Sequence, residues 1–382
     1  MTTFVDTSVL LSGTEASDQD PVVVVVRSAH GMLREGLGES ESGKFQQEFA
    51  NQYSEKNFSN IFDLLLGNTH VIFKRLAAEE GNVESVARIS KTAEGYFDVV
   101  LSILSKLESV EEVIERIQLF IKAIVDSEPK SVASVQALKL RLLKTLLTVL
   151  SPRVQLRLTV VAGLCRFGQE NPKFKSAVFK LVGETAKWID EFDWEVSDDE
   201  KFDLFGQIVS VAESLDRIDY MRKQLTVAPE VKKGPLAHAV EIEALNHPSF
   251  FDFESIKNST DANIAKIVDI FLSGDLQDMR NFTTKIDTID MTILVDKMRV
   301  VSIQAMAENK RQLPIDQISA QIGIADPFSV IVKAMQAGLV KGSINGVDGI
   351  VEITAVKPRS RSTRVATLGK LGKIQQAYRS HE

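Results

Sequence analysis

The chain is poor in cysteine and has no long apolar run. Its 382 residues include one cysteine, Cys165, so no disulfide can form within the chain. Cys165 lies in an apolar helical pattern, where we expect a buried and unreactive thiol. The longest aliphatic run, residues 22–26, is far shorter than the roughly 20 residues that span a bilayer. The N-terminus has no basic segment followed by an apolar one, so we expect a cytoplasmic protein, with the nucleus as the alternative, and no membrane partner.

Catalytic and cofactor-binding signatures are also missing. The five histidines show neither His-x-His nor His-Glu-x-x-His spacing, which argues against a zinc site. The sequence has no G-x-x-x-x-G-K-S/T loop, no G-x-G-x-x-G after a strand and no G-x-S-x-G elbow. The acidic run 190–200 lacks the framework of a calcium loop, so we interpret it as a solvated turn between helices. We therefore predict no catalytic residue, no cofactor and no metal, in a protein that is not an enzyme.

What the chain does have is helical periodicity, from about residue 45 to residue 286. Apolar residues recur three and four positions apart in segment after segment, for example in 58–66, 99–107, 113–124 and 138–147. The breaks are short, and Ser197 with Glu200 forms a capping-box pattern before another helix. Successive helices with short turns form antiparallel hairpins, and stacked hairpins form an α-solenoid. We predict a mainly α protein with a helical-repeat arm over residues 45–286, preceded by a variable, partly disordered segment over residues 1–44.

Residues 287–356 have the pattern of a winged helix. Helical spacing over 290–308, 314–322 and 327–337 predicts three helices. Strand-like runs over 339–344 and 350–353 flank Asn345 and Gly346, which together signal a hairpin. Three helices followed by a hairpin form a winged helix. Together with the last helices of the arm it would form a module of roughly residues 200–356.

The predicted winged helix lacks the cations of a DNA reader. Its third helix carries Lys333 alone, and the wing, residues 342–349, has Asp348 and no cation. Contact with phosphates requires Lys and Arg on these two elements. The formal net charge of −7 also argues weakly against nucleic-acid binding by the whole surface. We therefore favour a protein–protein module and predict no DNA partner.

The composition changes over residues 357–382. This segment contains seven Lys and Arg residues and one acidic residue. Its apolar residues recur at three- and four-residue intervals, which predicts a basic amphipathic C-terminal helix. Three interpretations stay open: a helix that packs on its own domain, a helix bundled with partner subunits, and an RNA contact. The residues that would contact partner helices are Leu368, Leu371, Ile374 and Tyr378. Those that would contact RNA are Arg359, Arg361, Arg364, Lys370 and Lys373.

An α-solenoid that runs into a winged helix resembles the PCI-domain family, whose members occur in the proteasome lid, the COP9 signalosome and translation initiation factor 3. Several segments between about residues 95 and 355 look like the subunit M branch found in translation initiation factor 3. They include residues 151–158 (SPRVQLRL), 187–190 (KWID), 244–253 (ALNHPSFFDF), 267–274 (IVDIFLSG) and 297–299 (KMR). The first 45 residues match no pattern of the family.

The resemblance implies a non-catalytic scaffold subunit of translation initiation factor 3 that supports its assembly on the small ribosomal subunit. Its partners would be other PCI and MPN subunits and, through the complex, the small ribosomal subunit. Membership of the COP9 signalosome, instead or in addition, is the main alternative, and an RNA-binding winged-helix module is the second. Family members pair the edges of their winged-helix sheets. The resemblance thus places partner contacts on Val340, Ser343, Ile344, Val351 and Ile353, besides the apolar residues of the tail.

Overall fold

The computed structural model describes residue 33 and residues 38–107, 109–150, 154–191, 196–284, 286–308 and 310–359. Most of the predicted variable segment and of the basic tail lie outside this part of the chain, although a helix already begins at Glu39. The chain divides into two compact units, Met1–Glu213 and Ser214–Glu382.

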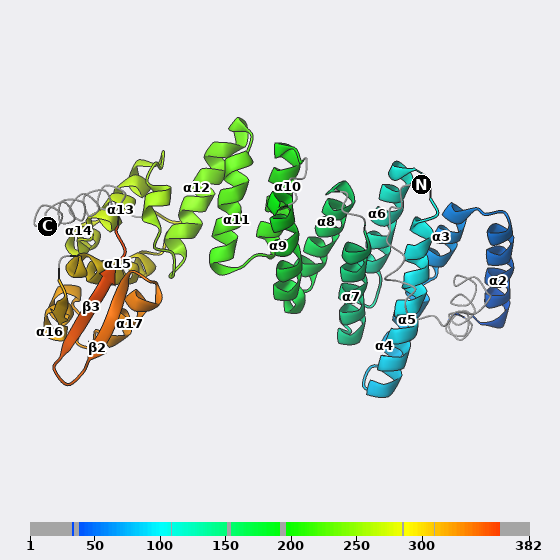
Figure 1. Cartoon of the computed structure of the whole chain (residues 1–382), viewed down its shortest axis with the longest axis horizontal. Helices are drawn as coiled ribbons and strands as arrows, with labels where there is room; N and C mark the ends of the chain where they lie inside the picture. The colour runs from blue at the N-terminus through cyan, green and yellow to red at the C-terminus, as the bar shows by residue number, and fades with distance from the viewer. Residues whose placement is uncertain are drawn as a thin grey trace, which may run out of the picture. The chain divides into compact units, whose positions relative to one another are not determined.

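The first unit is a stack of helices joined by short turns (Figure 1). Its helices are α2 (Glu39–Ser54), α3 (Phe58–Gly67), α4 (Thr69–Ala78), α5 (Val83–Leu104), α6 (Val110–Asp126), α7 (Ala133–Val149), α8 (Val154–Glu170), α9 (Lys175–Glu191) and α10 (Asp198–Val211). Helix α8 packs between α6 and α10 in one layer, and α5 packs on α7 in another. The predicted α-solenoid is confirmed for this unit.

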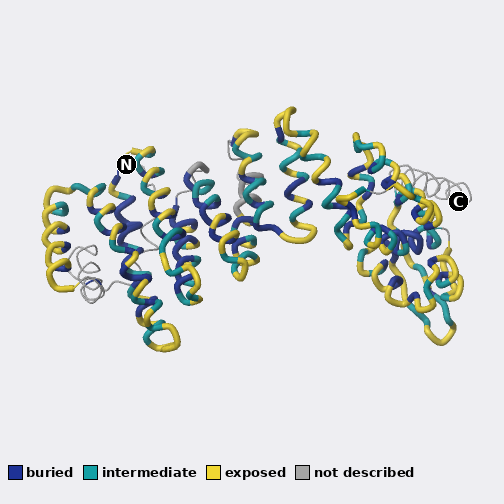
Figure 2. Tube along the Cα trace, turned by 180° about the vertical axis from the view of Figure 1, so that it is seen from behind, coloured by how far each residue is buried: buried dark blue, intermediate teal, exposed yellow. Residues whose placement is uncertain are grey.

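Apolar stripes and caps explain these helices. Each helix buries one face and exposes the other, as the alternating colours along the tube in Figure 2 show. In α3, the predicted stripe Ile61, Phe62, Leu65 and Leu66 is buried. The capping box is also confirmed: the Ser197 hydroxyl accepts from the Glu200 N–H at 3.3 Å, and the Glu200 carboxylate accepts from the Ser197 N–H at 2.9 Å.

One glycine sets the spacing of the layer. A side chain at Gly163 of α8 would overlap Ile121 of α6, so glycine lets the two helices approach closely.

The second unit combines helices with a small sheet. Its elements are α11 (Ser214–Val227), α12 (Glu230–Asn246), the 3₁₀ helix η2 (Phe253–Ile256), α13 (Ala262–Ser273), α14 (Leu276–Asn281), α15 (Met291–Ala307), β1 (Gln312–Pro314), α16 (Ile315–Ile322), α17 (Phe328–Gln336), β2 (Val340–Asn345) and β3 (Ile350–Val356). Helices α15, α16 and α17 with the β2–β3 hairpin confirm the predicted winged helix. None of the described helices of the chain is long and apolar enough to cross a bilayer.

The helices before the winged helix share its core. Buried residues of α11–α14, such as Leu276 and Phe271, form one cluster with Met298 of α15, Leu313 of β1 and Val351 of β3. Helices α11–α14 therefore belong to the compact unit that contains the winged helix, and this unit begins at Ser214. The sequence pattern places them at the end of the arm and, with the winged helix, in a module of roughly residues 200–356.

The sheet has a third strand that sequence patterns missed. Its order is β1-β3-β2, and β3 pairs antiparallel with both neighbours. Strand β1 spans three residues, too few for a period-two pattern, and its Pro314 had been assigned to a helix. Pro314 instead ends the strand and precedes α16 as its N-cap.

Candidate partner-binding surface

The winged-helix sheet has two edges of different kinds. Strand β1 is short and ends in proline, which makes it a poor template for another strand. Strand β2 spans six residues, and within the described part of the chain no strand pairs with its outer side. A β-bulge between Lys341 and Gly342 interrupts its register, so the regular stretch of this edge is 342–345.

The hydrogen bonds of β3 show which groups of β2 face outward. The Ile353 N–H donates to the Arg311 carbonyl at 2.6 Å, and the Ile315 N–H donates to the Gly349 carbonyl at 2.8 Å. From residue 349 to residue 353, before the bulge, odd-numbered residues therefore bond to β1 and even-numbered ones to β2, because antiparallel ladders alternate. Ser343 lies opposite Glu352 and bonds inward. The N–H and C=O of Ile344, between two inward-bonding residues, point outward.

This geometry corrects part of the predicted contact set. Val351 and Ile353 lie on the central strand, whose two sides are already paired. The side chains of Val340 and Val351 are each 1% exposed and pack in the core of their own unit, so they offer no surface to a partner. Ser343 is exposed and Ile344 is half-buried, and both belong to the open edge. The sequence could not separate these residues because β1 was not foreseen.

Helix α17 presents an apolar face where a DNA-reading helix presents cations. Phe328 and Val332 are one turn apart and 41% and 39% exposed. They lie away from the buried stripe of Val330, Ile331 and Ala334. At the tip of the wing Val347 is 98% exposed. Exposed apolar side chains on these elements suit a protein partner rather than a phosphate backbone. The sequence signal for Phe328 and Val332 was their four-residue spacing outside the buried stripe.

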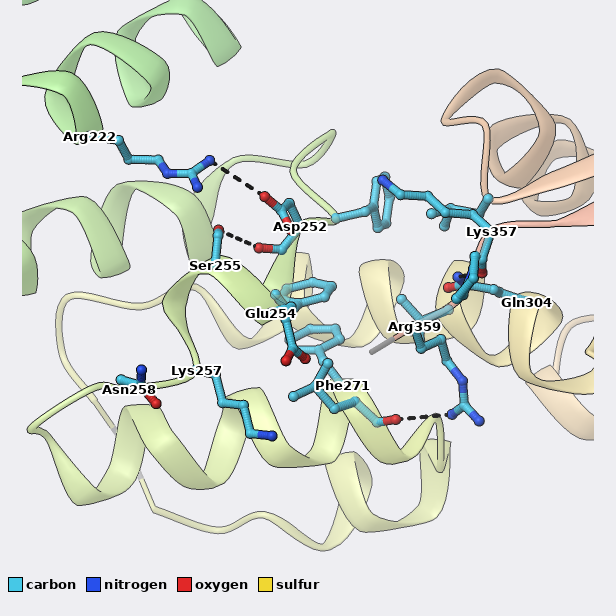
Figure 3. Close-up of a pocket in the computed structure, with 16 residues that line it drawn as sticks. Arg222, Asp252, Glu254, Ser255, Lys257, Asn258, Phe271, Gln304, Lys357 and Arg359 are labelled. Atoms are coloured by element: carbon cyan, nitrogen blue, oxygen red, sulfur yellow. Dashed lines mark hydrogen bonds and ion pairs between the residues drawn. The ribbon is translucent and has the colours of Figure 1, made fainter. Parts of the chain in front are cut away.

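The start of the basic tail is fixed to the second unit (Figure 3). The Lys357 N–H donates to the Leu339 carbonyl at 2.9 Å, and the Gln304 amide donates to the Lys357 carbonyl at 2.6 Å. The Arg359 guanidinium donates to both carboxylate oxygens of Glu308, at 2.7 and 2.9 Å. It also donates to the Leu272 carbonyl at 3.2 Å, at the C-terminus of α13.

The Arg359 guanidinium therefore binds groups of its own chain. Its side chain and that of Glu308 are each 17% exposed, and Gly274, with a φ of 80°, leaves room for the guanidinium. Its donors are bound to a carboxylate and to helix carbonyls, which argues against the predicted RNA contact of Arg359. The other predicted RNA contacts, Arg361, Arg364, Lys370 and Lys373, lie outside the described residues, and so do Leu368, Leu371, Ile374 and Tyr378.

A cavity of about 860 Å³ lies beside this segment (Figure 3). Charged groups of both signs line it, and Arg222 pairs with Asp252 at 3.5 Å. Phe253 and Phe271 stack at a centroid distance of 4.0 Å. Ser255 donates its hydroxyl to the Asp252 carbonyl, and neither a histidine nor a cysteine occurs among the described lining residues. This cavity shows no pairing of a nucleophile with a base.

Cys165 is 1% exposed, which confirms the predicted burial, and burial raises the pKa of its thiol to about 12, which disfavours the reactive thiolate. Among the described residues, no group of three or more His, Cys, Asp or Glu side chains is arranged to hold a metal ion.

Part of the chain is similar to a known domain family. The model of the PCI domain matches residues 276–355, which run from α14 to β3. The chain therefore contains a segment that matches the PCI domain, as the sequence resemblance had implied.

The chain is also similar to eukaryotic translation initiation factor 3 subunit M. It is 21% identical to the subunit of Dictyostelium discoideum over 296 residues, which cover 70% of this chain and 72% of the relative. It is 28% identical to that of Nematostella vectensis over 105 residues, covering 25% of this chain and 28% of the relative. For Schistosoma japonicum the identity is 21% over 230 residues, covering 55% of this chain and 58% of the relative.

Proposed function

We propose that the chain is a non-catalytic subunit of translation initiation factor 3 that supports assembly of the factor on the small ribosomal subunit in the cytoplasm. The observation that carries this proposal is a PCI winged helix with an open β2 edge and an apolar α17, in a chain similar to subunit M over 70% of its length. Its direct partners would be other PCI and MPN subunits of the factor.

The open edge supports a scaffold role on physical grounds. Unpaired N–H and C=O groups of a strand are satisfied when a partner adds a strand beside them. Exposed Phe328 and Val332 would lose contact with water in the same assembly. The apolar residues of the tail, Leu368, Leu371, Ile374 and Tyr378, would be buried in a bundle of partner helices.

Sedimentation of the tagged chain in cell extracts tests the proposal. We expect it to sediment with initiation factor 3 subunits and the small ribosomal subunit. We also expect depletion to reduce polysomes and re-expression of the chain to restore them. Sedimentation with COP9 signalosome subunits alone, and unchanged polysomes on depletion, would indicate that the chain belongs to that complex instead. Sedimentation as a free monomer would contradict a scaffold role in either complex.

A further inference from the structure

A groove in the first unit lies on the layer formed by α6, α8 and α10. Its volume is about 420 Å³, within the range of roughly 300–1,000 Å³ typical of ligand sites. It belongs to a different unit from the PCI domain, so its role is separate from the function proposed above. Its lining consists of Ile114, Gln118, Leu158, Thr159, Ala162, Glu200, Asp203, Leu204 and Gln207.

The groove has an apolar floor along α8. This helix lies between α6 and α10, and it contributes Leu158 together with the short side chains of Thr159 and Ala162. Leu204 of α10 is 2% exposed and lies at the base of the groove, while Ile114 of α6 is half-buried and extends the apolar surface. The α10 lining residues occur at positions i, i+3, i+4 and i+7, which is one face of a helix over about 10 Å.

The charge of the groove has one sign. Two carboxylates, Glu200 and Asp203, line it, and its described lining contains no lysine, arginine or histidine. Hydrogen bonds from Ser197 lower the pKa of Glu200, so this group is ionised at neutral pH. Asp198 and Asp199 add two more acids in the first turn of α10. A cationic partner would therefore be attracted to this rim.

The walls determine the conformation of the partner. All three are helices, whose interior N–H and C=O groups bond within the helix. Apart from the first turn of α10, they offer no free main-chain groups to an extended peptide, so a bound segment has to satisfy most of its own backbone. A helix does this, and an apolar stripe next to Lys or Arg matches an apolar floor next to Glu and Asp.

We propose that this groove binds a basic amphipathic helix of another protein. The apolar stripe of that helix packs on Ile114, Leu158 and Ala162. Its lysines or arginines pair with Glu200 and Asp203.

Fluorescence anisotropy of the full-length chain with a labelled 14-residue amphipathic peptide of leucine and lysine tests this. Asp203→Lys reverses one rim charge, and Ala162→Phe fills the floor. We expect each to weaken binding at least ten-fold at physiological salt. Glu184→Lys, the same charge change on α9 outside the groove, should leave the affinity unchanged. A peptide with serine in place of leucine should bind at least ten-fold more weakly. Circular dichroism checks that each variant is folded.

Two results would overturn the proposal. Equal weakening by Asp203→Lys and Glu184→Lys would mean that the affinity for the peptide depends on the overall charge of the chain and not on the groove. Equal affinity of the leucine and serine peptides would mean that the apolar floor binds nothing. A photo-crosslinker in place of Gln207 in cells provides an independent test, since crosslinked residues should fall in a basic amphipathic helix. Crosslinks that fall only in acidic or extended segments, or only in the basic tail of a second copy of this chain, would contradict the assignment.

Discussion

At the scale of single residues, Lys297 joins three parts of the second unit. It is 1% exposed and donates to the carbonyls of Ala244 and Leu245, at 2.8 and 3.0 Å, which ties α15 to the end of α12. The rings of Phe250, Phe253 and Phe271 surround its ammonium group at 5.1–5.8 Å. Burial lowers the pKa of Lys297 to about 7.

This pKa gives stability a predictable pH dependence. Between about pH 7 and pH 10.5 the folded state has released the proton of Lys297, while an unfolded lysine still holds it. The free energy of unfolding should therefore rise with pH in this window, by at most about 1.4 kcal/mol per pH unit. Lys297→Met should remove that slope, and at pH 7 it should cost about 1–3 kcal/mol for the two carbonyls left without a donor. Urea unfolding of both proteins at pH 7, 8 and 9 checks this, and parallel pH profiles would contradict it.

Arg359 leads to a second prediction at this scale. Arg359→Ala should lower the free energy of unfolding of the second unit by about 1.5–3 kcal/mol, because Glu308 and the α13 carbonyls lose a charged donor. Arg359→Lys should recover only part of this, since an ammonium group cannot bind both carboxylate oxygens in a fork. Hydrogen exchange should accelerate at the end of α13 in both variants. If instead only RNA affinity changed, with exchange unaltered, Arg359 would be a surface contact after all.

At the scale of secondary structure elements, the outer side of β2 can be tested by removing one donor. The Ile344 N–H points outward, so Ile344→Pro breaks no bond to β3, although it removes part of the packing of a half-buried side chain. We expect it to abolish co-purification of PCI partners while the chain still folds. Ile344→Val is the matched control and should keep the partners. Thermal unfolding distinguishes loss of the edge from loss of the fold, and full retention of partners by Ile344→Pro would exclude edge pairing.

Helix α17 should depend on apolar contact rather than on charge. A double variant, Phe328→Ser with Val332→Ser, should weaken partner binding at least ten-fold with little loss of stability, because both side chains are about 40% exposed. Lys333→Ala, on the same helix, should have little effect. Quantitative pull-down of the complex measures both. The reverse ranking would indicate an electrostatic surface of the kind that binds nucleic acid.

These elements also show how far sequence reasoning extends. The stripe of α3 and the capping box of α10 were predictable because period and capping are local properties. The hairpin of the wing was also predictable. Its loop, residues 346–349, is longer than a two-residue turn, and the Asn345 side chain accepts from the N–H groups of Val347 and Asp348 there. The edge of the sheet was not predictable, because it depends on a three-residue strand. The ion pair of Arg359 was not predictable either, because its partner Glu308 lies 51 residues away in the sequence.

At the scale of the whole molecule, the chain consists of two compact units with a boundary between Glu213 and Ser214. The second unit has its own apolar core, which extends from Ile218 to Val351. A fragment of residues 214–382 should therefore fold alone and unfold cooperatively. Circular dichroism and dispersed amide signals in NMR would show this. A fragment that stays unfolded would mean that its core needs the first unit.

The division has a consequence for function. The open edge and α17 belong to the second unit, and the acid-rimmed groove belongs to the first, so the chain presents surfaces of different chemistry on different units. Two such surfaces would let the chain contact different partners, as the proposed scaffold role requires.

The most direct test of the central claim is affinity purification of the tagged chain from cytosol, with mass spectrometry of the proteins present in stoichiometric amounts. We expect subunits of translation initiation factor 3, accompanied by proteins of the small ribosomal subunit. Stoichiometric signalosome or proteasome-lid subunits without initiation factors would contradict the account.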